Sequence, residues 1–156
     1  MSPDPRTLAG ACAALCLSAN LYAGSAADAV QADGAYARAV PPGQSNSAAF
    51  ITLINPSDAD HALVSAESNA AKVAELHSQT MEEGMMKMRR LEKIDLPAGE
   101  KVKLEPGGLH LMLIGLERQL SPGEEIDMTL VFEDGSRRTL TAPVKKVQDT
   151  MQHHRH

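Results

Sequence analysis

The sequence has no tryptophan, and aromatic residues make up only 3% of its 156 residues. Hydrophobic residues nevertheless reach 43% of the composition. Any core must therefore be built mainly from leucine, valine, isoleucine, alanine and methionine. This much apolar surface argues against disorder over most of the length. A chain of this size is expected to form one domain, since single domains commonly have roughly 100 to 200 residues.

Cysteine is nearly absent, and both cysteines fall within the first 26 residues. In that segment Arg6 precedes the apolar run LAGACAALCLSANLYA, and small residues follow. This three-part order is typical of a secretory signal peptide. We expect residues 1–26 to be a signal peptide that is cleaved after Ala23 or Ala26. The mature chain would then have no thiol, and no disulfide would stabilise it.

The apolar run of this first segment is short and contains Ser18 and Asn20, so a stable membrane span is not expected. A lipid anchor on Cys12, at the end of the tetrapeptide AGAC, would leave almost no apolar region before the cysteine. Secretion by a cleaved peptide is therefore favoured. Cleavage removes one acidic and one basic residue, so the formal charge stays at −5.

Clusters of positive charge are missing as well, because lysines and arginines are spread along the chain. Binding to the phosphates of nucleic acid needs clustered cationic groups, so nucleic acid is not an expected partner. The motifs G-x-S-x-G and H-E-x-x-H are absent, and the mature chain has no cysteine nucleophile. An enzyme is not predicted.

No segment shows a sustained helical period. The mature chain instead alternates short apolar runs with Gly, Pro and Asp, which is typical of an all-β sandwich or barrel. We expect one β domain over residues 27–147, in which residues 26–34 are a mobile lead-in, and a flexible tail over residues 148–156. The predicted strands cover 35–40, 48–55, 61–68, 72–78, 85–90, 100–105, 109–116, 125–133 and 136–147.

The segment LHSQTMEEGMMKM, residues 76–88, holds one histidine and four of the eight methionines of the chain. Its Glu-Glu-Gly sequence suits a short turn because glycine readily adopts positive φ. The flanking stretches AELHS and MMKMR are therefore predicted to pair as a hairpin. His77 and Met88 would lie opposite each other or nearly so, within reach of one ion. Met81 and Met86 would lie closer to the turn.

A second pair of candidate ligands lies in the segment LHLML, where strand alternation places His110 and Met112 on one face and the leucines on the other. The leucines would serve the core and leave the other face for a different task. Thioethers are soft donors that prefer Cu(I), whereas imidazole binds copper in either oxidation state. Two histidines and two methionines thus form a neutral ligand set that is suited to a soft monovalent ion.

His77, Met88, His110 and Met112 follow the spacing H-x10-M-x21-H-x-M. This motif and its flanks resemble the periplasmic copper chaperones called PCuAC. The similar stretches include AYARAVPPGQSNSAAFITLINPSDAD, MKMR, PGGLHLMLIGL and TLTAPVKKV, so the resemblance covers most of the mature chain. One departure is Tyr36, where the family often carries tryptophan and tyrosine is a conservative filler.

The resemblance implies a cupredoxin-like Greek-key β-barrel or sandwich in the periplasm, with Cu(I) bound by His77, Met88, His110 and Met112. It also implies a carrier that passes copper to the copper centre of a respiratory cytochrome c oxidase or to another periplasmic copper chaperone. We expect a monomer. An electron-transfer cupredoxin is not expected, because a blue copper site needs a cysteine thiolate. A copper scavenging or tolerance protein and a metal-independent secreted binding module are the alternatives.

The other methionines of the cluster have a simpler interpretation. Packing against the core or its rim is favoured for Met81, Met85 and Met86, although Met81 and Met86 could hold the ion during transfer. Met128 alternates with apolar neighbours and is assigned to the core. A flexible auxiliary site for Cu(II) and an adventitious His-rich terminus are equally favoured for the tail. Its candidate ligands are Met151, His153, His154 and His156.

Overall fold

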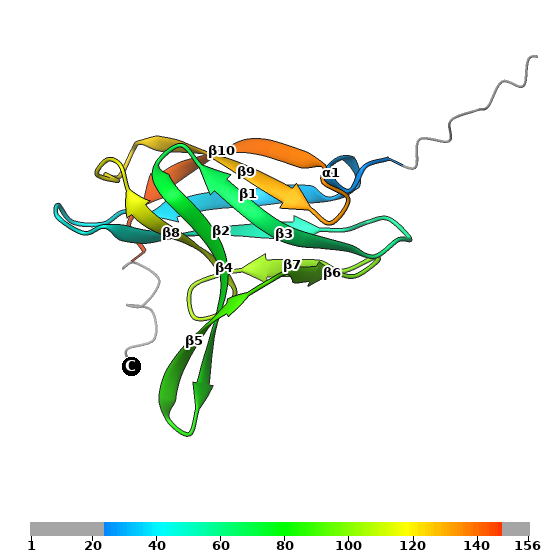
Figure 1. The fold of residues 1–156 in the computed structure, drawn as a ribbon, viewed down its shortest axis with the longest axis horizontal. Helices are drawn as coiled ribbons and strands as arrows, with labels where there is room; N and C mark the ends of the chain where they lie inside the picture. Colours follow the sequence, from blue (N-terminus) through cyan, green and yellow to red (C-terminus); the bar gives the residue numbers. More distant parts are fainter. Residues whose placement is uncertain (1–23, 148–156) are drawn as a thin grey trace, which may run out of the picture.

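Ten strands and one short helix make up residues 24–147, the part of the chain that the computed structural model describes (Figure 1). The helix is α1 (Ala26–Ala29). The strands are β1 (Gln31–Arg38), β2 (Asn46–Ile54), β3 (His61–Ser68), β4 (Ala71–Glu82), β5 (Met85–Leu91), β6 (Ile94–Leu96), β7 (Lys101–Leu104), β8 (His110–Leu116), β9 (Glu125–Phe132) and β10 (Arg137–Lys145).

Seven of these strands close into a barrel. Hydrogen-bonded neighbours follow the order β4-β8-β2-β1-β10-β9-β3, and a further pairing of β3 with β4 completes the ring. Strands β5, β6 and β7 are attached outside the ring, to β4, β3 and β2. The predicted all-β class is confirmed, and in the described residues no helix is long and apolar enough to cross a membrane.

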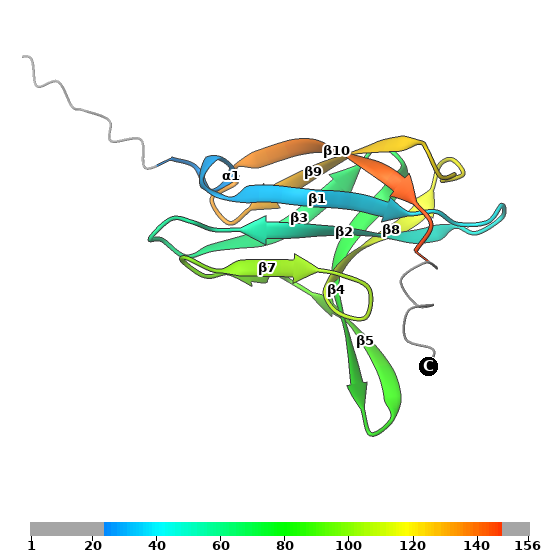
Figure 2. The same cartoon turned by 180° about the vertical axis from the view of Figure 1, so that it is seen from behind.

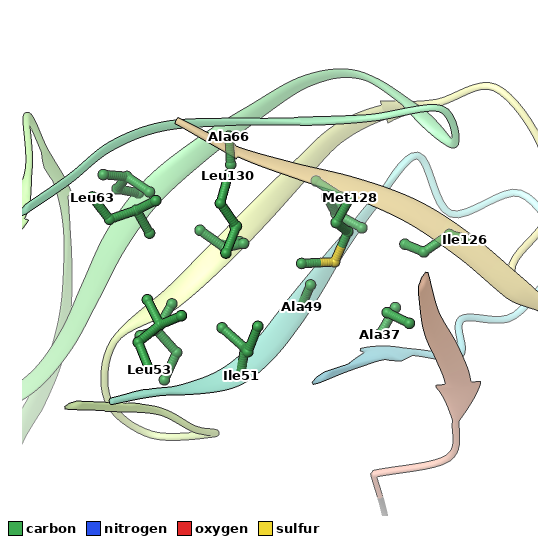
Figure 3. Packing of buried hydrophobic residues seen from close by; sticks show 14 of the residues in the cluster. Ala37, Ala49, Ile51, Leu53, Leu63, Ala66, Ile126, Met128 and Leu130 are labelled. Carbon is green, nitrogen blue, oxygen red and sulfur yellow. The ribbon is translucent and has the colours of Figure 1, made fainter. Parts of the chain in front are cut away.

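Aliphatic side chains fill the barrel. Along β9, alternate residues from Ile126 to Phe132 are buried. Met128 and Leu130 point across the interior toward Ala49 and Ile51 of β2 (Figure 3). Each such side chain contributes about 1.5 to 3 kcal/mol when it leaves water. The assignment of Met128 to the core is confirmed.

The N-terminal segment differs from the sequence interpretation, which treated residues 26–34 as a mobile lead-in. Ala26 and Val30 are fully buried. The backbone N–H of Ala26 donates to the carboxylate of Asp134 at 2.7 Å. The lead-in interpretation is wrong because these small residues pack against distant parts of the chain, and local periodicity does not reveal such contacts.

Every predicted strand corresponds to an observed one, although several ends differ. Strand β1 begins at Gln31, and β4 continues to Glu82. The short strand β6 was not predicted. It has only three residues and forms by pairing with β3, which leaves too little periodicity to detect in the sequence.

Strand β4 has two parts with different neighbours. Residues 71–77 pair with β8 in the barrel wall, whereas residues 76–82 pair with β5. The β4–β5 hairpin therefore leaves the barrel and projects from it (Figures 1 and 2). Its turn is Glu83-Gly84, with φ values of 53° and 78°, as in a type I′ turn. The hairpin prediction is confirmed, but the turn is centred one residue later than expected.

Candidate metal centre

Three neighbouring strands place the four predicted ligands on one face. His77 of β4 is the cross-strand partner of His110 of β8, and Met112 lies two residues further along β8. Met88 of β5 is opposite Gln79, which lies two residues beyond His77. Opposite residues share a face of a sheet, as do residues two apart on one strand. All four side chains therefore leave the same side of the sheet.

The shifted turn makes His77 and Met88 diagonal neighbours, since the residue directly opposite His77 is Arg90. Diagonal positions on a sheet lie about 7 to 8 Å apart, a span that long side chains bridge. The thioether of Met88 can therefore approach the imidazole of His77 from the hairpin side.

The two imidazole rings lie next to each other at the root of the hairpin. Their centroids are 5.8 Å apart, and the ring planes are tilted by 31°. His110 is only 4% exposed, and the side chain of His77 is 15% exposed. The pair therefore sits mostly away from water, at the junction of barrel and hairpin.

The two ring nitrogens of His77 differ in their hydrogen bonding. Nε2 lies 2.9 Å from a carboxylate oxygen of Glu75, and an ionised carboxylate can only accept, so Nε2 carries the proton. Nδ1 is buried and has no hydrogen-bond partner among residues 24–147. A carboxylate that orients a histidine in this way is the usual companion of a metal-binding imidazole. The unpartnered Nδ1 fits a metal ligand.

The ring of His110 is held through its other nitrogen, Nδ1, rather than through Nε2 as in His77. Its Nδ1 lies 3.0 Å from the carbonyl oxygen of Gly108, to which it donates, so Nε2 keeps its lone pair. The same carbonyl accepts the backbone N–H of Gln79 at 3.1 Å and links the hairpin to the start of β8. Burial lowers the pKa of His110, and the charge of Arg38, together with that of His77 when it is protonated, lowers it further, while the bond to Gly108 opposes them. The neutral imidazole that a metal requires is therefore favoured.

The two thioethers differ in exposure. Met112 is partly buried on β8, whereas Met88 on the hairpin is 47% exposed. Both line a cavity of about 750 Å³ together with His110. A second hollow of about 830 Å³, between β3 and β4, is lined by none of the four candidate ligands. The first cavity therefore reaches three of the four candidate ligands, and His77 is not among its lining residues.

Comparison with known proteins places the chain in a family. Residues 30–144 match the family model described as "Putative lipoprotein LpqE-like". The chain belongs to the LpqE-like family. A relative from Leifsonia xyli subsp. xyli with a similar lipoprotein description is 37% identical over 123 residues, which cover 78% of this chain and 73% of the relative.

Solved structures resemble this LpqE-like chain. Solution structures of DR1885 from Deinococcus radiodurans match at 38% identity and a TM-score of 0.61 for the apo form, over 80% of this chain and 83% of that one. The Cu(I) form matches at 39% identity and a TM-score of 0.57, over 73% of this chain and 76% of that one. A copper-bound PCuAC domain from PmoF2 has a TM-score of 0.65 at 24% identity, over 76% of this chain and 93% of that domain. The predicted cupredoxin-like fold and the PCuAC resemblance are confirmed.

In this LpqE-like chain two of the four candidate donors are sulfur atoms. The described residues contain no group of three or more His, Cys, Asp or Glu side chains that could hold a metal ion. The set formed by His77, Met88, His110 and Met112 offers two imidazole nitrogens and two thioether sulfurs, all of them neutral. Such donors are suited to a soft monovalent cation.

The remaining methionines of the hairpin are not packed. Met81 and Met86 are cross-strand partners on the ligand face and are 68% and 61% exposed, while Met85 is 67% exposed on the opposite face. The packing interpretation of these three residues is wrong, because the hairpin projects beyond the barrel. The tail candidates lie outside the described residues: Met151, His153, His154 and His156.

Sequence reasoning missed Glu75 and Gly108, which orient the two imidazoles. A signal for Glu75 was available, because the order Glu-Leu-His on a strand places the carboxylate beside the imidazole on one face. Gly108 contributes only a backbone carbonyl, so no side-chain pattern identifies it.

Proposed function

We propose that this protein is an exported copper chaperone that carries Cu(I) between His77, Met88, His110 and Met112. The observation that carries the proposal is the pair of neighbouring imidazoles. Each has one nitrogen held by a hydrogen bond and the other available for a ligand. The two thioethers share their face, so the four neutral donors would surround one bound ion.

The site would load and release copper by exchanging ligands one at a time. His110 and Met112 belong to the barrel wall and form its fixed side. Met88 belongs to the projecting hairpin and is the most exposed of the four, so a partner would replace it first. No covalent bond of a substrate is made or broken, and the protein acts as a carrier rather than an enzyme.

The relatives support copper as the cargo. DR1885, which is 39% identical to the matched part of this chain, has a structure described as its Cu(I) form. The recipient would be the copper centre of a cytochrome c oxidase or another periplasmic copper chaperone. A scavenging or tolerance protein would hold the ion instead, so transfer from the loaded protein to an isolated oxidase copper domain separates the two roles.

Export is supported by the lipoprotein description of the family and of the Leifsonia relative. We expect cleavage after Ala23 rather than after Ala26, because Ala26 is buried and bonded to Asp134. Mass spectrometry of the protein purified from its native periplasm would give a chain that begins at Gly24. A lipidated Cys12 would contradict this prediction.

An anaerobic competition titration with a Cu(I) chelator tests the proposed site. The wild-type protein should show one tight equivalent of Cu(I). This affinity should fall in each of four variants, His77→Ala, Met88→Leu, His110→Ala and Met112→Leu. Met85→Leu is the matched control, because Met85 is an exposed methionine of the same hairpin on its other face. Several weak and equivalent sites, or four variants that bind like the control, would refute the proposal.

A metal-independent binding module is the second candidate, and the cavity beside the site favours it. That cavity of about 750 Å³ is lined in part by Pro41, Pro106 and Pro122, which offer an apolar surface to a ligand. If His77→Ala combined with Met88→Ala leaves copper binding unchanged, this second function is supported.

A further metal site for Cu(II) is proposed for the C-terminal segment, where imidazoles are available as ligands. Titration of Cu(II) into the full chain and into a chain that ends at Val147 tests it. The full chain should bind an additional equivalent, and equal affinity and stoichiometry would contradict the second site.

A further inference from the structure

Methionine accounts for nearly all of the large hydrophobic surface exposed in residues 24–147. The exposed large hydrophobic residues there are Val73, Met81, Met85, Met86 and Met88. All four methionines belong to the β4–β5 hairpin, and Met81, Met85 and Met86 are more than 60% exposed. Only Met88 belongs to the proposed copper site, so the other three need a separate explanation.

These methionines do not stabilise the fold by burial. Among the described strands, β5 pairs only with β4, and the distal half of the hairpin projects from the barrel (Figure 2). An apolar side chain that stays in water in the folded state gains little hydrophobic stabilisation. An exposed strand would normally carry polar residues at these positions. The property that can explain methionine at these exposed positions is its thioether, which is a soft sulfur donor.

The ladder places three of the thioethers together. Met81 and Met86 are directly opposite each other, and such pairs have Cβ atoms about 4.5 to 5.5 Å apart. Met88 lies two residues from Met86 on the same strand and therefore on the same face. A row of sulfur donors thus runs from the tip of the hairpin to the proposed site.

The charged side chains of the distal hairpin lie on the other face. Glu82 forms ion pairs with Lys87 at 3.1 Å and with Arg89 at 3.3 Å. These three residues share their face with Met85. Between the turn and His77 the face of Met81 and Met86 carries neutral side chains, and the charged Arg90 lies on this face only at the barrel end, opposite His77.

We propose that Met81 and Met86 form a second Cu(I) site made only of thioethers, from which the ion passes to and from the proposed site through Met88. This inference rests on the proposed function, because Met88 must be a ligand of the proposed four-ligand site and also receive the ion from the Met81–Met86 site. During the passage Met88 keeps its bond to copper while His77 replaces a thioether. All donors are neutral and copper stays Cu(I), so neither a proton nor an electron moves. The exposed pair lacks imidazole and should bind more weakly.

The experiment follows the methionine methyl groups by NMR in the full chain labelled with methyl-13C methionine, as Cu(I) is added without oxygen. The first equivalent should shift the methyl signals of Met88 and Met112. The second equivalent of Cu(I) should shift the methyl signals of Met81 and Met86 and leave the methyl signal of Met85 unchanged. The double variant M81L/M86L should lose the second step and keep the first, and transfer to a Cu(I) chelator should become slower. The control M85L should keep both steps and the wild-type rate.

The inference would be overturned if M81L/M86L kept the second step, or if its transfer rate equalled that of M85L. A Met85 signal that shifted together with Met81 and Met86 would indicate nonspecific binding to thioethers and would also refute it. A second step seen only at Met151 would assign that step to the tail and exclude the hairpin. The proposed function is tested separately, since M112L should weaken the first step. If it does not, the four-ligand site fails whatever the second step shows.

Discussion

At the scale of single residues, the site is defined by which nitrogen of each histidine is free. Glu75 holds Nε2 of His77, and the carbonyl of Gly108 holds Nδ1 of His110. The two rings therefore offer different nitrogens, and each orientation depends on one neighbouring acceptor. Copper affinity should respond to these neighbours as well as to the ligands.

Glu75→Ala should weaken Cu(I) binding by about 10- to 100-fold, the usual effect of losing a carboxylate that orients a metal-binding histidine. A chelator competition titration measures the change. Glu75 lies 3.7 Å from Arg90, and Glu67 likewise pairs with an arginine, Arg137, but away from the site. Glu67→Ala is therefore the control. Equal affinities in the two variants would show that the carboxylate of Glu75 does not support the site.

The pKa of His110 provides a second prediction. Burial lowers this pKa in the folded protein, so the unfolded chain binds the proton more readily. The stability that neutral His110 provides is complete above the ordinary histidine pKa and is lost as pH falls through the folded value. In the apo protein, an NMR titration of the imidazole signal, assigned with His110→Gln, should give a midpoint below that of an unfolded peptide. A midpoint at or above the peptide value would contradict the buried neutral imidazole.

Strand alternation and matched spacing restrict the choice of candidate ligands in the sequence, and the structure places His77, Met88, His110 and Met112 on one face of three neighbouring strands. The sequence could not predict the exposure of Met81, Met85 and Met86, because exposure depends on what packs against a strand. The same apolar side chain fits a core and a projecting hairpin, and local sequence does not separate the two environments.

At the scale of elements, the hairpin is the part of the site that projects from the barrel (Figure 2). Residues 76–82 of β4 pair with β5, and the end of this ladder is fixed by the Glu83-Gly84 turn. Its register determines where Met88 lies relative to His77. The sequence predicted the hairpin and a short turn within Glu82-Glu83-Gly84, but with the centre between Glu82 and Glu83, one residue early. A type I′ turn needs positive φ at both central residues, which favours Glu83-Gly84 over Glu82-Glu83. The observed turn uses the glycine at positive φ.

Gly84→Ala should destabilise the hairpin by about 1 to 2 kcal/mol, the cost of an L residue in the left-handed region. Cu(I) affinity should fall because Met88 is less well placed, while the melting temperature of the barrel should change little. The control is Gly99→Ala, since Gly99 also has a positive φ of 74° and open space around it, in the turn between β6 and β7. Amide hydrogen exchange of the hairpin together with Cu(I) affinity checks the prediction. Equal copper affinities in both variants would contradict it.

At the scale of the whole molecule, the core and the candidate site are separate. The core lies inside the ring of seven strands, whereas Met88 is on a strand outside it. The barrel class could be predicted from strand spacing. Helix α1 and strand β6 could not be predicted, since they depend on long-range contacts such as the bond between Ala26 and Asp134.

Because the core does not depend on the ligands, the apo protein should fold and unfold cooperatively. Cu(I) should stabilise the folded state by mass action, by about 4 kcal/mol when free ion exceeds Kd about a thousandfold. Thermal unfolding with and without buffered Cu(I) measures this stabilisation. Without copper, Met112→Leu should have the melting temperature of the apo wild type, and added Cu(I) should raise its melting temperature much less. An apo protein that is unfolded at room temperature would contradict the account and indicate a structural metal.

X-ray absorption at the copper K-edge tests the central claim most directly, on protein loaded with one equivalent of Cu(I). The account predicts a shell of nitrogen and sulfur donors, from two histidines and two methionines. The sulfur contribution should decrease in Met88→Leu and in Met112→Leu, and it should stay unchanged in Met85→Leu. A shell with nitrogen or oxygen donors alone, or a sulfur contribution that neither Met88→Leu nor Met112→Leu reduces, would contradict the four-ligand site.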